Sequence, residues 1–424
     1  MRTTALPAVP PSLPPLTRDT REGCAPWPAA VWVVLVGTGI TRAAGFTFPF
    51  LSYRLSGLGY STGEVTAVMA LFGVGWLAGQ ILWGRAADLL GRRTALVSAM
   101  LLAAVAFPLL AEATGPVAVG GAAVVAGAVY DASRPVATAL VSDQVPDAGA
   151  RARITGWRHF ATNVGAAVTG AVGGLLADRA GVPVLFWING AACALFALAV
   201  LWVMDADRPR RGEAGSGRGM YRQASGDVRL WLLWLVSLAA LVPAVGLFSI
   251  MPLLMQANGL PVTAYGWTQV ASAAAVLIIS APLNGWLGRR ASHSTMVGLL
   301  GASALVLGAG IGSAGLAHST LEYTVAAVCA VPGEVALFVA GNSILDRIAP
   351  AHGRGLYAGI WGSTLAAAVI CAPALAGWSL SHGGPGLVGL TTLSCGVLGA
   401  AACLPLGLLL RRARTPRQAL LPPS

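Results

Sequence analysis

The sequence predicts an all-α integral membrane protein with twelve transmembrane helices, arranged as two pseudo-symmetric six-helix bundles. Of its 424 residues, 56% are hydrophobic and only 10% are charged, and the mean hydropathy is +0.72. A soluble domain carries about 25% charged residues, so this chain cannot cover a water-facing surface. Apolar segments of about 20 residues, the length that spans a bilayer as a helix, recur along the chain. The second half of this series also repeats features of the first.

The order of segments divides the chain into five parts. Residues 1–28 are rich in proline and polar residues, and we expect a disordered cytoplasmic tail. Residues 29–204 form the N-terminal bundle, 205–229 a flexible basic linker, 230–410 the C-terminal bundle, and 411–424 a second cytoplasmic tail. The predicted helices are Ala29–Leu51, Thr62–Trp83, Thr94–Ala113, Val117–Ser142, Gly156–Leu176, Pro183–Met204, Leu230–Met255, Thr263–Leu287, Thr295–Ala314, Thr320–Leu345, Leu356–Leu380 and Gly386–Leu410.

The arginines predict the orientation in the membrane. With the N-terminus in the cytoplasm, the tails and cytoplasmic loops hold 23 of the 27 arginines, and the opposite side holds Arg54 and Arg179. Cytoplasmic loops of membrane proteins carry such an excess of basic residues. We therefore expect a multi-pass protein of the cell (inner or plasma) membrane with both termini cytoplasmic. The net charge of +11 reflects this orientation, so nucleic acid is not an expected partner.

A short charged segment separates the second and third predicted helices. It reads Gly-Arg-Ala-Ala-Asp-Leu-Leu-Gly-Arg-Arg, from Gly84 to Arg93. Asp88 and Arg92 cannot lie in hydrocarbon, so the segment lies at a membrane surface. Gly84 and Gly91 are expected to let the chain turn tightly. The pattern resembles the signature loop of the major facilitator superfamily, which implies a secondary transporter.

The two halves of the chain align with a constant shift of 203 residues around the fourth and tenth helices. The resemblance to the superfamily covers residues 29–410 and implies two related bundles. Together with Asp88 and Arg92, the matched charges at the helix ends are expected to form a cytoplasmic latch, a set of ion pairs that breaks when the protein opens inward. The alternative is that these residues are solvated loop charges. The matched pairs are Asp131 with Glu334, Asp143 with Asp346, and Arg151 with Arg354.

Four ionisable residues lie well inside predicted helices: Arg42, Asp131, Arg134 and Glu334. A charge at mid-bilayer costs about 2.5–3.5 kcal/mol, so such residues face a cavity or a partner. Asp131 and Arg134 are three residues apart on one helical face and can pair. Pro135 follows and should weaken the helix there. Either the pair holds this kink, or Asp131 gains and loses a proton as substrate moves.

The roles of the other embedded charges stay open. Glu334 follows Pro332 and Gly333, which predict a break in helix ten; it either satisfies freed backbone groups or is a second proton or cation site. Arg42 either pairs with an acid or faces the cavity. Arg134 resembles the helix-four arginine of the drug–proton antiporter motif, which is tied to proton coupling. The glutamine and glycine that continue that motif are missing here.

Helix five carries Asn163 and then a glycine-rich run from Gly165 to Gly174. This run is similar to another antiporter motif, with Thr169-Gly170 in place of its Gly-Pro. The glycines predict close packing against a neighbouring helix, which limits leak past a gate or is ordinary packing. Asn163 either lines the cavity or bonds across helices. Aromatic residues near helix middles are candidates for lining an apolar cavity, with packing or lipid contact as the alternative: Phe46, Phe48, Trp76, Tyr130, Phe248, Trp267 and Trp361.

The sequence contains no phosphate loop, metal cluster or nucleophile elbow, so we expect no enzyme and no cofactor, only a proton gradient. Our first hypothesis is proton-coupled export of a small hydrophobic drug or natural product by alternating access, with Asp131 as proton carrier and Arg134 tuning its pKa. The second is an uptake symporter or facilitator, and the third a non-transporting membrane sensor. The expected partners are a small-molecule substrate and membrane lipid, and the family default is a monomer.

Overall fold

The computed structural model describes residues 27–145, 147–205, 217–289, 293–350 and 354–412. Regular structure in these ranges is helical throughout, as predicted. Residues 1–26 and 413–424 of the two predicted tails lie outside them. The helices are α1 (Ala29–Ala43), α2 (Leu51–Gly57), α3 (Thr62–Leu90), α4 (Arg92–Glu112), α5 (Pro116–Tyr130), α6 (Ser133–Gln144), α7 (Ala148–Ala180), α8 (Val182–Val203), α9 (Gly217–Gly226), α10 (Val228–Ala257), α11 (Val262–Arg289), α12 (His293–Gly312), the 3₁₀ turn η1 (Ser313–Leu316), α13 (Thr320–Ile348) and α14 (Arg354–Arg412).

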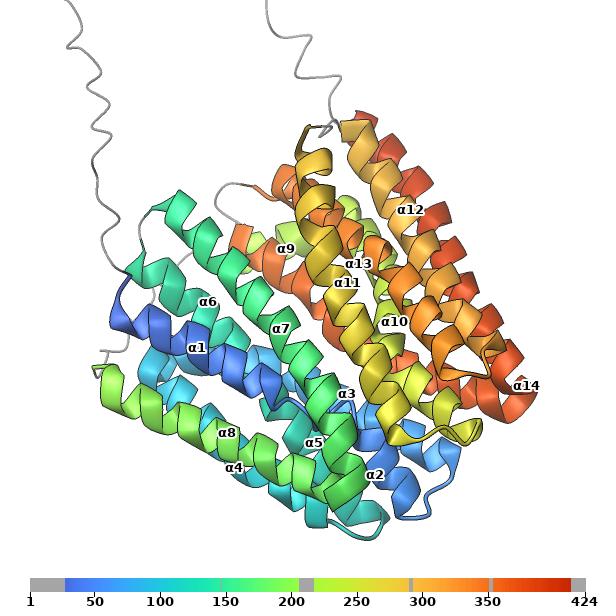
Figure 1. The fold of residues 1–424 in the computed structure, drawn as a ribbon. Coiled ribbons are helices and arrows are strands. Elements are labelled where there is room, and N and C mark those ends of the chain that lie inside the picture. The colour runs from blue at the N-terminus through green and yellow to red at the C-terminus, as the bar shows by residue number, and fades with distance from the viewer. Residues whose placement is uncertain (1–26, 146, 206–216, 290–292, 351–353, 413–424) are drawn as a thin grey trace, which may run out of the picture.

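The helices form two bundles, α1–α8 and α10–α14 (Figure 1). The bundles meet mainly along two helix pairs, α7 with α11 and α3 with α14. Figure 1 shows the bundles converging toward α2 and separating toward α9. We call the end at which α3 passes into α4 the Gly91 end, and the opposite end, at which α14 bends, the Gly384 end. Within the described residues, ten helices are long and apolar enough to cross a membrane.

The first predicted helix is interrupted. Helix α1 ends at Ala43 and α2 begins at Leu51, with the segment between them buried. Backbone that leaves a helix at membrane depth needs other hydrogen-bond partners. Asn189 of α8 supplies one, because its Oδ1 accepts from the Thr47 amide (3.3 Å) and hydroxyl (2.7 Å). Sequence reasoning did not single out Asn189.

The fourth predicted helix also breaks, four residues before Pro135, where a proline ring clashes with the helical carbonyl group. The chain leaves helical geometry at Asp131, which follows α5, and α6 begins at Ser133. Pro135 lies in the first turn of α6, where a missing N–H costs no helical hydrogen bond. The break expected at Pro332 is absent, because α13 continues through it. The weak point expected beside Pro135 is therefore confirmed, and the break expected at Pro332 is wrong.

The last two predicted helices are joined in α14. They meet at Gly384, whose φ of 67° and ψ of −161° is a conformation that glycine adopts readily. The predicted flexible linker is partly helical, since it contains α9. Asp227 then caps α10 and accepts from Arg229 (2.8 Å) and from the Tyr357 hydroxyl of α14 (3.2 Å). These contacts anchor the end of the linker to the C-terminal bundle.

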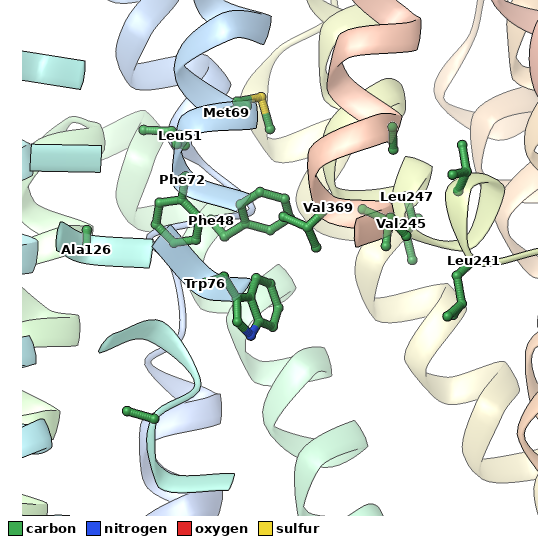
Figure 2. Close-up of a cluster of buried hydrophobic side chains, with 14 of the residues drawn as sticks. Phe48, Leu51, Met69, Phe72, Trp76, Ala126, Leu241, Val245, Leu247 and Val369 are labelled. Carbon is green, nitrogen blue, oxygen red and sulfur yellow. The ribbon is translucent and has the colours of Figure 1, made fainter. Parts of the chain in front are cut away.

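The buried apolar core runs continuously from one bundle into the other. Figure 2 shows Phe48, which follows α1, pointing from the N-terminal bundle toward Val369 of α14. Phe48 stacks on Phe72 of α3 with ring centroids 5.3 Å apart, and Trp76 lies edge-on at 6.0 Å. The bundles therefore share an aromatic and aliphatic seam close to the broken segment after α1.

Candidate proton and substrate site

The break between α5 and α6 places a carboxylate inside the N-terminal bundle. Asp131 is 8% exposed, and its Oδ2 lies 2.8 Å from Nε of Arg134. The pairing expected from their spacing is therefore formed. The Arg134 side chain is 43% exposed, so the pair connects a buried acid to an accessible cation. Gln80 of α3 donates to the Asp131 carbonyl oxygen (3.3 Å) and holds this turn against α3.

Tyr130 fixes the position of the turn from the other side. Its hydroxyl donates to the Gly45 carbonyl oxygen (3.2 Å). The guanidinium carbon of Arg42 lies 5.9 Å from the Tyr130 ring centroid, a cation–π contact. Arg42 was expected either to pair with an acid or to face the cavity. Among the described residues it has an aromatic partner and forms no ion pair with an acid. Four aromatic rings lie 5.1–6.3 Å from Tyr130, namely Phe48, Phe72, Trp76 and Phe107.

A fourth charged residue joins this cluster, and sequence reasoning missed it. Arg158 of α7 donates to Thr138 Oγ1 of α6 (3.1 Å) and interacts electrostatically with both Asp131 and Arg134. Its position two residues after the start of the predicted helix at Gly156 suggested a loop arginine. Because α7 begins at Ala148, Arg158 instead lies about three turns inside the helix.

The acid of the C-terminal bundle stands apart. Glu334 is partly buried in α13 and makes no hydrogen bond or ion pair with another described residue. Its two interpretations therefore both stay predictions. In the same bundle, Trp361 donates to Ser237 Oγ (2.9 Å) and packs on Gly341, and Phe248 is partly buried against the core. Trp361 therefore makes packing contacts within this bundle, and a place for it in a cavity stays a prediction.

Two other aromatic candidates differ in burial. Phe46 is 2% exposed and packs against Phe50, so it belongs to the core. Trp267 is 55% exposed and follows Tyr265 by two residues, about 200° around α11. Because Tyr265 packs against Phe50 of the other bundle, Trp267 points away from the interface. Asn163, the polar candidate on α7, is partly buried and has a partner.

The charged segment after α3 is built around Gly91 and Arg92. Gly91 ends α3 with φ 91°, which favours glycine, but Gly84 lies inside α3 and makes no turn. Arg92 binds Asp88 (2.6 Å) and Asp143 of α6 (3.1 Å). The network ties α3, α4 and α6 of one bundle together.

The second copy of the expected latch stays a prediction. Asp346 is exposed and makes no ion pair with a described residue, and the side chain of Arg354 lies outside the described residues. Near the first copy, Arg151 donates to the Val145 carbonyl oxygen (2.9 Å), and Arg93 donates to that of Leu201 (2.8 Å). The observed charge network therefore lies within the N-terminal bundle.

Glycines bring the two bundles into close contact at the Gly384 end. A Cβ atom on Gly170 of α7 would lie 2.5 Å from the Cβ of Gln269, and one on Gly174 would lie 3.2 Å from Gly266. Gly165 packs as closely against Arg42 of α1. The predicted close packing of the helix-five glycines is thus confirmed.

The α3–α14 pair is also closed at the Gly384 end. A Cβ atom on Gly73 would lie 2.9 Å from Ile370, and one on Gly377 would lie 2.1 Å from Thr66. Toward the Gly91 end, Gly84 of α3 has nothing within 4 Å of such an atom. The same holds for Gly359 of α14 and Gly156 of α7. Glycine-mediated contact between the bundles is therefore concentrated at one end.

The two helical bundles share an interface that is closed at one end, and charged residues are buried beside it. This is the architecture of a multi-pass membrane protein of the secondary-transporter class. The family model of the Major Facilitator Superfamily matches residues 31–334 and 246–424. The chain belongs to the major facilitator superfamily. Among curated proteins, no sequence matches it.

Solved structures show the same fold. An aspartate-to-alanine mutant of the nucleoside transporter NupG has a TM-score of 0.71 and 13% identity, covering 88% of this chain and 99% of its own. A POT family transporter with a thioalcohol-conjugated peptide has a TM-score of 0.73 and 12% identity, covering 91% and 96%. The peptide transporter POT with sulfate has a TM-score of 0.71 and 17% identity, covering 90% and 96%.

Proposed function

We propose that the protein is a proton-coupled secondary transporter that moves a small, mostly apolar molecule across the cell membrane by alternating access. The Gly91 end faces the cytoplasm. The observation that carries this proposal is the one-ended contact between the bundles, because a path between them is then sealed on one side only. Asp131 is the proton carrier, since a buried carboxylate paired with an accessible arginine can exchange its charge with the path.

The register of the α3–α14 pair supports movement between two states. Thr66 lies opposite Gly377, and Gly73 lies opposite Ile370. The two helices are therefore antiparallel here, and seven residues along α3 correspond to seven residues in the opposite direction along α14. Eleven residues further, about three turns on the same faces, Gly84 opposes Gly359. Small residues at matched positions let membrane helices approach closely. We infer that Gly84 packs against Gly359 when the Gly91 end closes.

The direction of transport has two candidates. Export is favoured by the resemblance of Arg134 and of the helix-five glycines to antiporter motifs. The glycines are weak support for export, because close packing between helices also accounts for them. Uptake together with protons is favoured by a specific observation, the excess of arginine around Asp131. Protons and an anionic substrate would then bind together.

The test is transport by the purified protein in liposomes with an imposed pH gradient. The probes are ethidium, a hydrophobic cation, and phenylacetate, a hydrophobic anion. We expect gradient-dependent movement of one probe in the wild type and loss of that dependence in Asp131→Asn. Glu112→Gln is the control, because Glu112 is a carboxylate at the Gly384 end that accepts from Trp187 (2.8 Å). Undiminished gradient dependence in Asp131→Asn would remove this residue from the coupling step.

A further inference from the structure

We propose that Arg134 and Arg158 form a binding site for an anionic group, and that the substrate is a small amphipathic organic acid. The inference rests on the proposed transport function and names its substrate class. The site lies between α6 and α7, beside the break at Asp131, and Arg42 adds positive charge behind Tyr130.

The charge balance of the site is the first argument. Among the described residues around the break, Arg42, Arg134 and Arg158 carry three positive charges, and Asp131 is their one acidic neighbour. Buried charges are tolerated in a membrane protein when they are paired or face water. A site with an excess of two positive charges therefore favours an anion as its remaining partner.

Unused hydrogen-bond donors are the second argument. A guanidinium presents five N–H donors in a planar fork that matches a carboxylate. Arg158 uses its fork for one neutral acceptor among the described residues, Thr138. Arg134 approaches Asp131 through Nε, and its side chain is 43% exposed. Both forks thus have donors left for a ligand that enters between the bundles.

The third argument is the aromatic cluster next to the arginines. Tyr130, directly before Asp131, packs against Trp76 at 5.1 Å and Phe72 at 5.3 Å. Figure 2 places Trp76 beside Phe48, on the side of α3 that faces the C-terminal bundle. Trp76 and Phe72 are buried and Tyr130 is partly exposed, so an acid group on the arginines would leave the rest of the ligand close to Tyr130. An amphipathic acid fits both halves of the site.

The same geometry links the anion to the proton. The charged and titratable groups around Asp131 are Arg134 of α6, Arg158 of α7, and Tyr130 of α5 with Arg42 of α1 upon it. Ionised Asp131 competes with an incoming carboxylate for Arg134, and protonation removes that competition. Proton and anion then favour each other's binding, by linkage, and travel in the same direction.

The test is ligand-dependent thermal stabilisation of the purified full-length protein without any gradient. Benzoate, phenylacetate and 4-phenylbutyrate are each compared with the corresponding amide and amine. We expect at least one acid to stabilise the wild type and its amide and amine to have no effect. Arg158→Gln should weaken the acid about tenfold or more, as expected for loss of charge-assisted hydrogen bonds, and Arg158→Lys should weaken it less.

The change in acid affinity caused by Asp131→Asn decides between the proposal and its alternatives. It leaves the arginines without their acid, so the acid should bind several-fold tighter, and its binding should no longer strengthen as pH falls. Weaker binding of the acid in Asp131→Asn, stabilisation by the amines, or no response to any acid in either protein would overturn the proposal. Since binding is measured without a gradient, this outcome is independent of whether Asp131 couples transport to protons.

Discussion

Helices α3 and α5 approach each other closely at Gly79, and this contact makes a quantitative prediction. A Cβ atom on Gly79 would lie 2.0 Å from the carbonyl oxygen of Ala128, which also accepts from the Trp83 indole (2.9 Å). A carbon and a carbonyl oxygen normally stay about 3.3 Å apart, so Gly79→Ala must push the helices apart by about 1 Å. Overpacking of this kind costs about 1–3 kcal/mol.

The matched control lies on the same helix. Gly84 has nothing within 4 Å of a Cβ atom, so Gly84→Ala should be neutral or gain up to about 1 kcal/mol from helix propensity. The two alanine variants should therefore differ by about 1–4 kcal/mol in stability, measured as unfolding midpoints of purified protein by tryptophan fluorescence. Equal midpoints, or a more stable Gly79→Ala, would refute the helix contact described here.

Three further predictions concern polar contacts. Asn189→Leu leaves the buried Thr47 amide without its hydrogen-bond acceptor and should destabilise the fold by about 1–3 kcal/mol. Adding Thr47→Val to the same chain should not restore the stability fully, because the backbone amide stays unpaired. An unchanged unfolding temperature in Asn189→Leu would contradict this. Burial raises the pKa of Asp227, but hydrogen bonds and charge from Arg229 outweigh it and hold that pKa below its ordinary value. The group therefore adds stability above the ordinary aspartate pKa and loses it as pH falls through the lowered one, so the advantage of wild type over Asp227→Asn should shrink in acid; a pH-independent difference would count against the pair. Arg92→Gln should cost only about 0–1 kcal/mol, because its partners are at the surface; a much larger loss would show that the network is more than a surface ion pair.

The sequence predicted the fold well because a helix that spans a bilayer needs a long, continuous apolar segment, which is easy to recognise. Apolar length located the spans, and the glycine-rich run of α7 correctly indicated close helix packing. The breaks were harder to place. Pro135 correctly indicated the break at Asp131, where Gln80 and Tyr130 hold the turn, but Pro332 indicated a break that is absent from α13. A proline in the first turn of a helix is compatible with that helix.

The candidate site was only half visible in the sequence. The spacing of Asp131 and Arg134 predicted their ion pair, because it depends on one helix face. Arg158 was missed because α7 starts earlier than the hydropathy suggested, and a charged helix end reads as a loop. Trp267 was chosen for its residue type, whereas its direction depends on which face of α11 meets the other bundle.

The central claim is that the bundles close at the Gly91 end in a second state, and cross-linking tests it directly. Gly84→Cys and Gly359→Cys are introduced together in a chain whose six native cysteines have been replaced. A disulfide needs Cα atoms about 4.4–6.8 Å apart, so it can form only if α3 and α14 meet there. We predict that the pair cross-links in membranes and that reduction restores transport. Absence of a cross-link, while Thr66→Cys with Gly377→Cys cross-links readily, would contradict alternating access in this protein.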